Sequence, residues 1–223
     1  MGQKVERIAK VIKRLEYLFE CILSIIYPCE NYCIVCKKED CILICNKCLK
    51  SITKLSKEEN GIISYSYYSG VIKRLILRLK YKNDFSAGDV LAILLAEYIK
   101  ENFEYSKCVL TYIPLSKKSM KNRGFNQCKY ICKKVCNILH MECFDLLEKI
   151  KETREQKRLD KFEREENIKN AFKIKKYMDL GRSQIILIDD VVTTGSTLKE
   201  GYKILKQFYK NDIKLLTLAK TNI

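Results

Sequence analysis

The most informative part of the sequence reads Ile185-Ile-Leu-Ile-Asp189-Asp190-Val-Val-Thr193-Thr194-Gly195-Ser196-Thr197. An apolar segment ends in two carboxylates, and a turn rich in hydroxyl groups then opens a helix. In open α/β sheets, ligands bind beyond the carboxyl ends of the strands. The stretch therefore predicts one strand and one helix of an α/β sheet, with a ligand site at the turn between them.

The residue types in this turn suit a ribose 5-phosphate. Backbone N–H groups of the turn, with the helix N-terminus behind them, bind a phosphate, and Gly195 lets the ligand approach the backbone closely. Ionised Asp189 and Asp190 are hydrogen-bond acceptors only, which suits the two hydroxyl groups of a ribose. The predicted binding residues are Asp189, Asp190, Val191, Thr193, Thr194, Gly195, Ser196 and Thr197.

Other interpretations of the same turn fit less well. The glycines are too few for a G-x-G-x-x-G dinucleotide fingerprint, and the sequence has no Gly-Lys-Ser/Thr of a P-loop. A plain strand and a helix capped by Ser196 or Thr197 would leave the two adjacent carboxylates unexplained.

Outward from this stretch, apolar segments alternate with helical patterns. Strands are expected at about 62–68, 109–113, 185–188 and 213–218, and helices at about 71–81, 90–99, 127–139 and 197–209. Near-continuous apolar strands that alternate with helices indicate a parallel sheet. A polar loop is expected before residue 127, and the charged segment 149–170 is either an exposed helix or a mobile loop.

Two paired cysteines near the N-terminus predict a metal site. Cys33-x₂-Cys36 and Cys45-x₂-Cys48 have the spacing of a tetrahedral Cys₄ zinc site with a structural role. Cys29 and Cys41 are additional thiols nearby, and either could replace a ligand. Three further cysteines, Cys128, Cys132 and Cys136, share one helix face, where core packing is favoured over a cluster ligand set.

The composition restricts the compartment and the partners. Because the chain of 223 residues has twelve cysteines but no signal-peptide pattern, we expect it in the reducing cytoplasm. Its formal net charge of +16 attracts polyanions such as nucleic acid, an anionic membrane or a phosphorylated small molecule, or else reflects lysines on solvated helix faces. Lysines around the paired cysteines favour contact with the backbone of single-stranded DNA.

Three parts of the chain are expected: an amphipathic helix at 1–28, a zinc module at 29–56 and an α/β domain at 57–223. Apolar residues recur every three or four positions along the first part, and Pro28 ends the pattern. Its basic opposite face leaves two possibilities open, packing against the chain's own domain or a partner, and peripheral contact with a membrane.

The stretch 185–197 resembles the signature of type I phosphoribosyltransferases, and further segments narrow the resemblance to the ComF family of competence-associated proteins. The family's Val-Pro segment, running into Arg-Gly-Phe-Asn-Gln, is similar to Ile113-Pro-Leu-Ser-Lys-Lys-Ser-Met-Lys-Asn-Arg123-Gly124-Phe125-Asn126-Gln127. Its Thr-x-x-Gln, Arg-x-x-Asn and Ala-Phe elements are similar to Thr153-Arg-Glu-Gln156 and to Arg164-Glu-Glu-Asn167-Ile-Lys-Asn-Ala-Phe172, and its Leu-Lys-Tyr to Leu79-Lys80-Tyr81. The resemblance covers about residues 18–220.

The resemblance implies a type I phosphoribosyltransferase fold, a twisted parallel sheet flanked by helices, preceded by a small Cys₄ zinc module. It implies that phosphoribosyl pyrophosphate (PRPP) binds with Mg²⁺ and that the cations after the first core strand hold the pyrophosphate: Lys117, Lys118, Lys121 and Arg123. It implies that residues 150–170 form a flap over the substrate, with its functional residues at Thr153, Arg154, Gln156, Arg164 and Asn167. Transfer would displace pyrophosphate from the anomeric carbon without a side-chain nucleophile.

Three functions stay open. One is a PRPP-binding, phosphoribosyltransferase-like protein that serves DNA uptake, transformation and recombination, with competence or recombination proteins as partners. Another is a non-catalytic competence factor that binds single-stranded DNA through the zinc module and the basic surface. The third is an active nucleobase-salvage phosphoribosyltransferase unrelated to DNA uptake. The sequence specifies neither the acceptor nor the oligomeric state.

Overall fold

The computed structural model describes residues 31–55, 58–152 and 161–221, and at positions 161, 162, 164 and 165 it describes the backbone alone. The helix expected at 1–28 and the thiol of Cys29 lie outside the described residues. The chain divides into two compact units, Met1–Cys45 and Asn46–Ile223, and each is described by itself.

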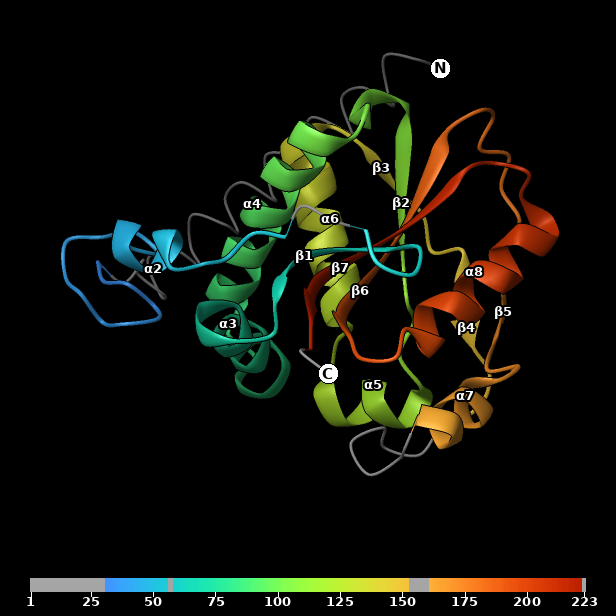
Figure 1. The fold of residues 1–223 in the computed structure, drawn as a ribbon, viewed down its shortest axis with the longest axis horizontal. Coiled ribbons are helices and arrows are strands. Elements are labelled where there is room, and N and C mark those ends of the chain that lie inside the picture. The colour runs from blue at the N-terminus through green and yellow to red at the C-terminus, as the bar shows by residue number, and fades with distance from the viewer. Residues whose placement is uncertain (1–30, 56–57, 153–160, 222–223) are drawn as a thin grey trace, which may run out of the picture. The chain divides into compact units, whose positions relative to one another are not determined.

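The second unit is built on a parallel sheet of five strands (Figure 1). Its strands, in spatial order, are β1 (Ile62–Tyr67), β7 (Ile213–Lys220), β6 (Gln184–Val192), β2 (Cys108–Tyr112) and β3 (Glu142–Cys143). The central strands are fully buried apolar runs, as sheets covered on both faces require. The predicted parallel sheet is confirmed.

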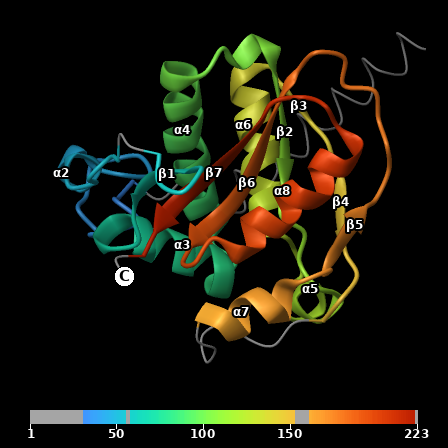
Figure 2. The same ribbon diagram turned by 45° about the vertical axis from the view of Figure 1, so that its right-hand side comes forward.

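Helices flank this sheet. Figures 1 and 2 show the first three of them grouped on one side and the last on the other: α3 (Gly70–Lys82), α4 (Phe85–Asn102), α6 (Gln127–Leu139) and α8 (Ser196–Phe208). Alternate residues of β6, such as Ile185 and Leu187, join Leu198 and Leu205 of α8 in one core cluster. Because side chains alternate along a strand, Ile186 and Ile188 face the other helices, and so does the residue that follows them by two, Asp190.

Smaller elements complete the fold. They are α2 (Asn46–Lys50), the 3₁₀ helix η1 (Tyr105–Lys107), α5 (Lys117–Arg123), α7 (Lys161–Ile168) and an antiparallel ribbon of β4 (Leu147–Lys149) with β5 (Phe172–Ile174). The charged segment that the sequence left open between helix and loop contains α7. None of the helices in the described ranges is long and apolar enough to cross a membrane.

The polar loop expected before residue 127 is wrong for its central part, which is helix α5. The Ser116 hydroxyl accepts a hydrogen bond from the Ser119 backbone N–H at 3.2 Å and caps the helix start. Gly124, in the left-handed region at φ 79°, ends the helix with its N–H on the Met120 carbonyl. A helix of two turns with no buried residue has no apolar periodicity, so the sequence pattern could not reveal it.

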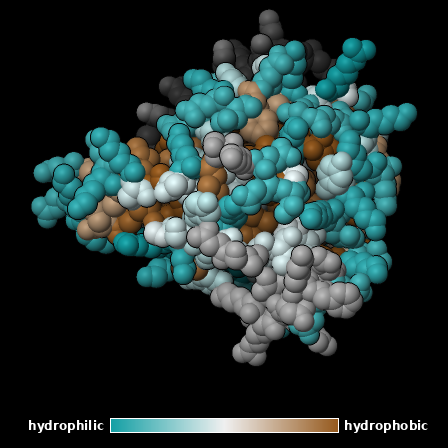
Figure 3. Space-filling view, in the orientation of Figure 1, coloured by the Kyte–Doolittle hydropathy of each residue, from teal (hydrophilic) through white to brown (hydrophobic). Residues whose placement is uncertain are grey.

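The surface agrees with the lysine-rich composition. Figure 3 shows that hydrophilic side chains cover most of the face viewed in Figure 1, with apolar atoms visible in small gaps between them. A chain with 43 basic and 27 acidic residues therefore presents many cations to solvent on this face.

Candidate functional site

The turn between β6 and α8 lines a small cavity of its own. Its lining residues are Asp189, Val191, Val192, Thr193, Thr194, Gly195, Ser196, Thr197 and Leu198. The hydroxyl oxygens of Thr194 and Ser196 lie 2.7 Å apart and share a hydrogen bond. The structure thus brings together all the predicted ribose-phosphate residues except Asp190.

Gly195 is required by the geometry of this turn. Its φ is 80°, the left-handed conformation that disfavours side chains, and it stands at the N-cap of α8. A Cβ atom here would lie 2.7 Å from Cδ1 of Ile62, closer than two carbon atoms can pack. The glycine keeps the backbone of the turn against β1 and leaves its outer side open to a ligand.

The two aspartates of the motif have different surroundings. Asp190 is buried, and its Oδ2 lies 2.6 Å from Nζ of Lys80 and accepts a hydrogen bond from the Gln127 side-chain amide at 2.5 Å. The sequence treated both carboxylates as free acceptors for ribose hydroxyls. The structure leaves Asp189 facing the cavity and gives Asp190 two partners inside the protein.

Asp189 is held in an environment that resists ionisation. Burial, and then the neighbouring Asp190 carboxylate, raise the pKa of Asp189 to about 7. Its Oδ1 accepts the Asp190 backbone N–H at 2.8 Å and lies 3.6 Å from the Cys128 sulfur. Cys128 is buried, as the core-packing interpretation of that helix face expects, and it also contacts the site.

Two residues that sequence reasoning did not assign to the site connect its parts. Lys80 pairs with Asp190, and Gln127 bonds to Asp190 while its Oε1 accepts a hydrogen bond from Arg123. The Arg123 guanidinium in turn lies 5.7 Å from the ring centroid of Tyr81. Both Lys80 and Gln127 stand in segments that carry the family resemblance, so the signal was present but its partner was not readable.

The four cations expected to hold pyrophosphate separate into two groups. Lys117 and Lys121 of α5 line a cleft of about 450 Å³, together with Lys129, Lys149 and Lys175. Lys118 does not line it, and its backbone N–H donates to Glu152 at 3.0 Å.

Arg123 does not line this cleft either, because it turns to Gln127 and Tyr81. Burial lowers the pKa of Lys149, although the carboxylates of Asp189 and Glu152 oppose the shift. The cleft as a whole is basic, although Asp145 and Glu148 also line it.

Most of the expected flap lies outside the described residues. This holds for Thr153, Arg154 and Gln156. Arg164 and Asn167 belong to α7, where only Asn167 has a described side chain, half-buried. The role of these five residues stays a prediction.

Four thiols cluster as the cysteine spacing predicts. One sulfur from each of Cys33, Cys36, Cys45 and Cys48 lies within 4.8 Å of the others. Burial alone would raise the pKa of Cys33, but backbone N–H groups of Cys36, Cys45 and Val35 outweigh it and lower that pKa to about 6. Four close thiols with thiolate-favouring N–H groups are the donor set that Zn²⁺ prefers. Cys41 lies outside the cluster, so the described residues support the original four.

A second group of three, Cys128, Asp189 and Asp190, also lies within 4.8 Å. It does not fit Mg²⁺, because that ion requires oxygen ligands in near-octahedral geometry, and a thiol is a soft ligand. Asp190 is moreover neutralised by Lys80. The protein therefore offers no resident magnesium cage in these three residues.

The raised pKa of Asp189 predicts how stability depends on pH. Its folded-state pKa of about 7 exceeds the value of about 4 expected in the unfolded chain. Between pH 4 and 7 the unfolded state binds fewer protons, so the free energy of unfolding falls as pH rises, by on the order of a few kcal/mol. We expect Asp189→Asn to flatten that fall, measured by urea unfolding at pH 4.5, 6 and 7.5. A parallel fall in the variant would refute this origin.

Comparison with known proteins gives relatives over most of the chain. No family model matches it. It is 31% identical over 195 residues to "Competence protein ComFC" of Streptococcus pneumoniae, which covers 86% of this chain and 81% of the relative. It is 27% identical to "Competence protein F" of Haemophilus influenzae over 79% of this chain and 78% of the relative. Among solved structures, adenine phosphoribosyltransferase from Leishmania tarentolae matches with a TM-score of 0.45 and 11% identity, over 75% of this chain and 94% of that one.

Proposed function

The chain belongs to the ComF family, and from this membership we propose that it is a phosphoribosyltransferase-like protein that binds a ribose 5-phosphate ligand, PRPP above all, in the service of DNA uptake. One observation carries the ligand: the cavity at the β6–α8 turn unites Asp189 with the hydroxyl groups and glycine of residues 193–197. The names of two relatives, both competence proteins, support the biological role.

In this proposal the turn holds the 5-phosphate through its backbone N–H groups and hydroxyls. The Asp189 carboxylate accepts a hydrogen bond from a ribose hydroxyl, and the lysines of the basic cleft, Lys117 and Lys121 among them, attract the pyrophosphate. Mg²⁺ supplies charge neutralisation and enters with the pyrophosphate. Asp190 acts as a positioning residue, because its bonds to Lys80 and Gln127 fix the end of β6 against α3 and α6.

The cysteine cluster is proposed to hold one structural zinc ion. Four thiolates would order a segment that has few buried apolar side chains of its own, namely Cys33, Ile34, Cys45 and Cys48 within residues 31–50. The three-part organisation at 1–28, 29–56 and 57–223 and a cytoplasmic location complete the proposal. A single-stranded DNA partner would meet the lysines near the cluster, where the Lys37 ammonium lies 3.9 Å over the Tyr32 ring.

Thermal unfolding with PRPP and Mg²⁺ tests the ligand. A ligand at about a hundred times its dissociation constant adds roughly 2.7 kcal/mol, which raises the midpoint of a chain this long by roughly 5–10 °C. We expect that shift in the wild type and its loss in Asp189→Asn. The matched control Asp179→Asn, an exposed carboxylate remote in sequence from the turn, should keep it.

A wild type with an intact fold but no shift would overturn the proposal. It would favour the non-catalytic role, in which the protein binds single-stranded DNA without a phosphoribosyl ligand. A full shift combined with turnover of free nucleobases would instead favour the salvage role.

A further inference from the structure

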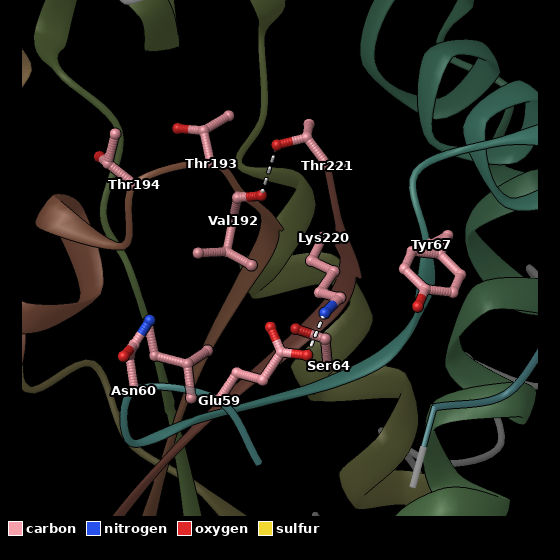
Figure 4. Close-up of a pocket in the computed structure, with 10 residues that line it drawn as sticks. Glu59, Asn60, Ser64, Tyr67, Val192, Thr193, Thr194, Lys220 and Thr221 are labelled. Carbon is pink, nitrogen blue, oxygen red and sulfur yellow. Dashed lines mark hydrogen bonds and ion pairs between the residues drawn. The ribbon is translucent and has the colours of Figure 1, made fainter. Parts of the chain in front are cut away.

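A second cavity adjoins the ribose-phosphate turn. It has a volume of about 450 Å³ and lies where the carboxyl ends of β6 and β7 meet β1 and the residues before it (Figure 4). Its lining residues are Glu59, Asn60, Ile62, Ser64, Tyr67, Val192, Thr193, Thr194, Lys220 and Thr221. Thr193 and Thr194 also line the cavity of the turn, so a ligand here would touch the same loop as the ribose phosphate.

A donor and an acceptor stand side by side in this cavity. The Lys220 ammonium lies 2.5 Å from a carboxylate oxygen of Glu59, and Figure 4 shows the two side chains meeting in front of Ser64. The Lys220 side chain is 18% exposed and that of Glu59 is 60% exposed, so solvent or a ligand can reach the pair. A ligand edge that carries an acceptor next to a donor could bond to both at once.

An aromatic ring borders the same pair. The Lys220 ammonium lies 5.3 Å from the ring centroid of Tyr67, a cation–π distance, so the ring face is turned toward it. Figure 4 shows Tyr67 on β1, across from Thr193 and Val192. A flat ligand could therefore stack on Tyr67 while its edge reaches Lys220 and Glu59.

Other polar groups of the cavity are already engaged. The Ser64 hydroxyl accepts a hydrogen bond from Thr217 at 2.9 Å, and the backbone N–H and hydroxyl of Thr221 donate to the Val192 carbonyl at 3.0 and 3.4 Å. Recognition thus depends mainly on Lys220, Glu59 and the ring. Because the two charges cancel, the cavity favours a neutral ligand over an anion.

We propose that this cavity is the acceptor subsite, and that the acceptor is a planar nitrogen heterocycle of the nucleobase class that stacks on Tyr67. This inference rests on the proposed function. A lone pair of a ring nitrogen would form the bond to the anomeric carbon of PRPP. The carbon–oxygen bond would break, its electron pair would leave with pyrophosphate, and the proton of the ring nitrogen would pass to water.

Calorimetric titration of the full chain tests the assignment. The protein is first saturated with ribose 5-phosphate, and adenine, hypoxanthine and uracil are then titrated separately. We expect at least one base to bind, and Lys220→Met and Glu59→Gln each to weaken it about tenfold or more. Ribose 5-phosphate affinity should stay within about twofold in both variants, and the exposed Lys210→Met should change neither affinity. Unfolding midpoints without ligand show that each variant folds.

The outcomes separate the two proposals. If ribose 5-phosphate binds the wild type and no base does, the acceptor subsite is overturned while the ribose-phosphate site stands. Base binding that survives unchanged in both folded variants places the base elsewhere and also overturns it. If neither ligand binds, both proposals fail together. Because Glu59 is exposed, Glu59→Gln decides the matter even if Lys220→Met does not fold.

Discussion

Replacing Cys45 with serine is expected to abolish zinc binding and to unfold residues 31–50. The cluster of Cys33, Cys36, Cys45 and Cys48 is the main element that can order this segment, and structural zinc contributes about 10–16 kcal/mol of apparent binding energy in comparable modules. A site that loses one of four thiolates loses most of that energy. The parallel sheet, which has its own core, should keep its structure.

Metal analysis and amide hydrogen exchange measure this effect together. The wild type should contain about one zinc per chain and protect the backbone N–H groups of Cys33 and Ile34, which bond to the carbonyls of Lys38 and Leu43. Cys45→Ser should lose both the metal and the protection. Cys41→Ser, a half-buried thiol outside the cluster, is the matched control and should retain both. A metal-free wild type with full protection would show that the segment folds without zinc.

Lys80→Met is expected to lower the free energy of unfolding by about 3–5 kcal/mol, the usual effect of removing one partner from a buried ion pair. The side chains of Lys80 and Asp190 are only 17% and 7% exposed, and their charged atoms lie 2.6 Å apart. Methionine preserves the length of the side chain but leaves the Asp190 carboxylate with Gln127 alone. Urea unfolding at pH 7 measures the loss.

Two variants show whether the pair itself is responsible. Lys82→Met removes a cation from the exposed end of the same helix and should cost less than about 0.5 kcal/mol. The double variant Lys80→Met, Asp190→Asn removes both charges and should recover part of the loss. A double variant as unstable as the sum of its single variants would mean that the two residues do not interact.

The order and type of the main elements could be predicted because their patterns are local. Helix α6 begins and ends at the predicted residues, Gln127 and Leu139, since its apolar face repeats regularly and Asn126 caps it. Strand β6 was expected to end at its first carboxylate but continues to Val192, because its neighbour β7 pairs with it up to that residue. A strand's end depends on its partner, which a single segment does not reveal.

The two-residue strand β3 and the β4–β5 ribbon were missed for a related reason. Leu147 and Phe172 pair across a charged segment that has no apolar pattern of its own, and two- or three-residue strands are too short to show a period. Their positions follow from the tertiary structure rather than from local sequence.

At the candidate site, the sequence identified the residues and the structure supplied their partners. The turn at 193–197 could be read directly, because glycine and hydroxyl residues have a recognisable use there. The different surroundings of Asp189 and Asp190 could not, because they depend on Lys80, which lies 110 positions away in α3. The same holds for Arg123, whose guanidinium is directed by Gln127 and Tyr81 away from the cleft that its charge suggested.

The pairing of β1 with β7 has a consequence for synthesis on the ribosome. Strand β1 has one sheet neighbour, and that neighbour is β7; Ser64 and Thr217, which bond across the pair, are 153 positions apart. A nascent chain must therefore hold β1 unpaired until the segment through Lys220 has emerged. Because Glu59 and Lys220 meet only then, the cavity beside the turn is among the last features of the protein to form, and a nascent chain that stalls before β7 would have the phosphate-binding turn without it.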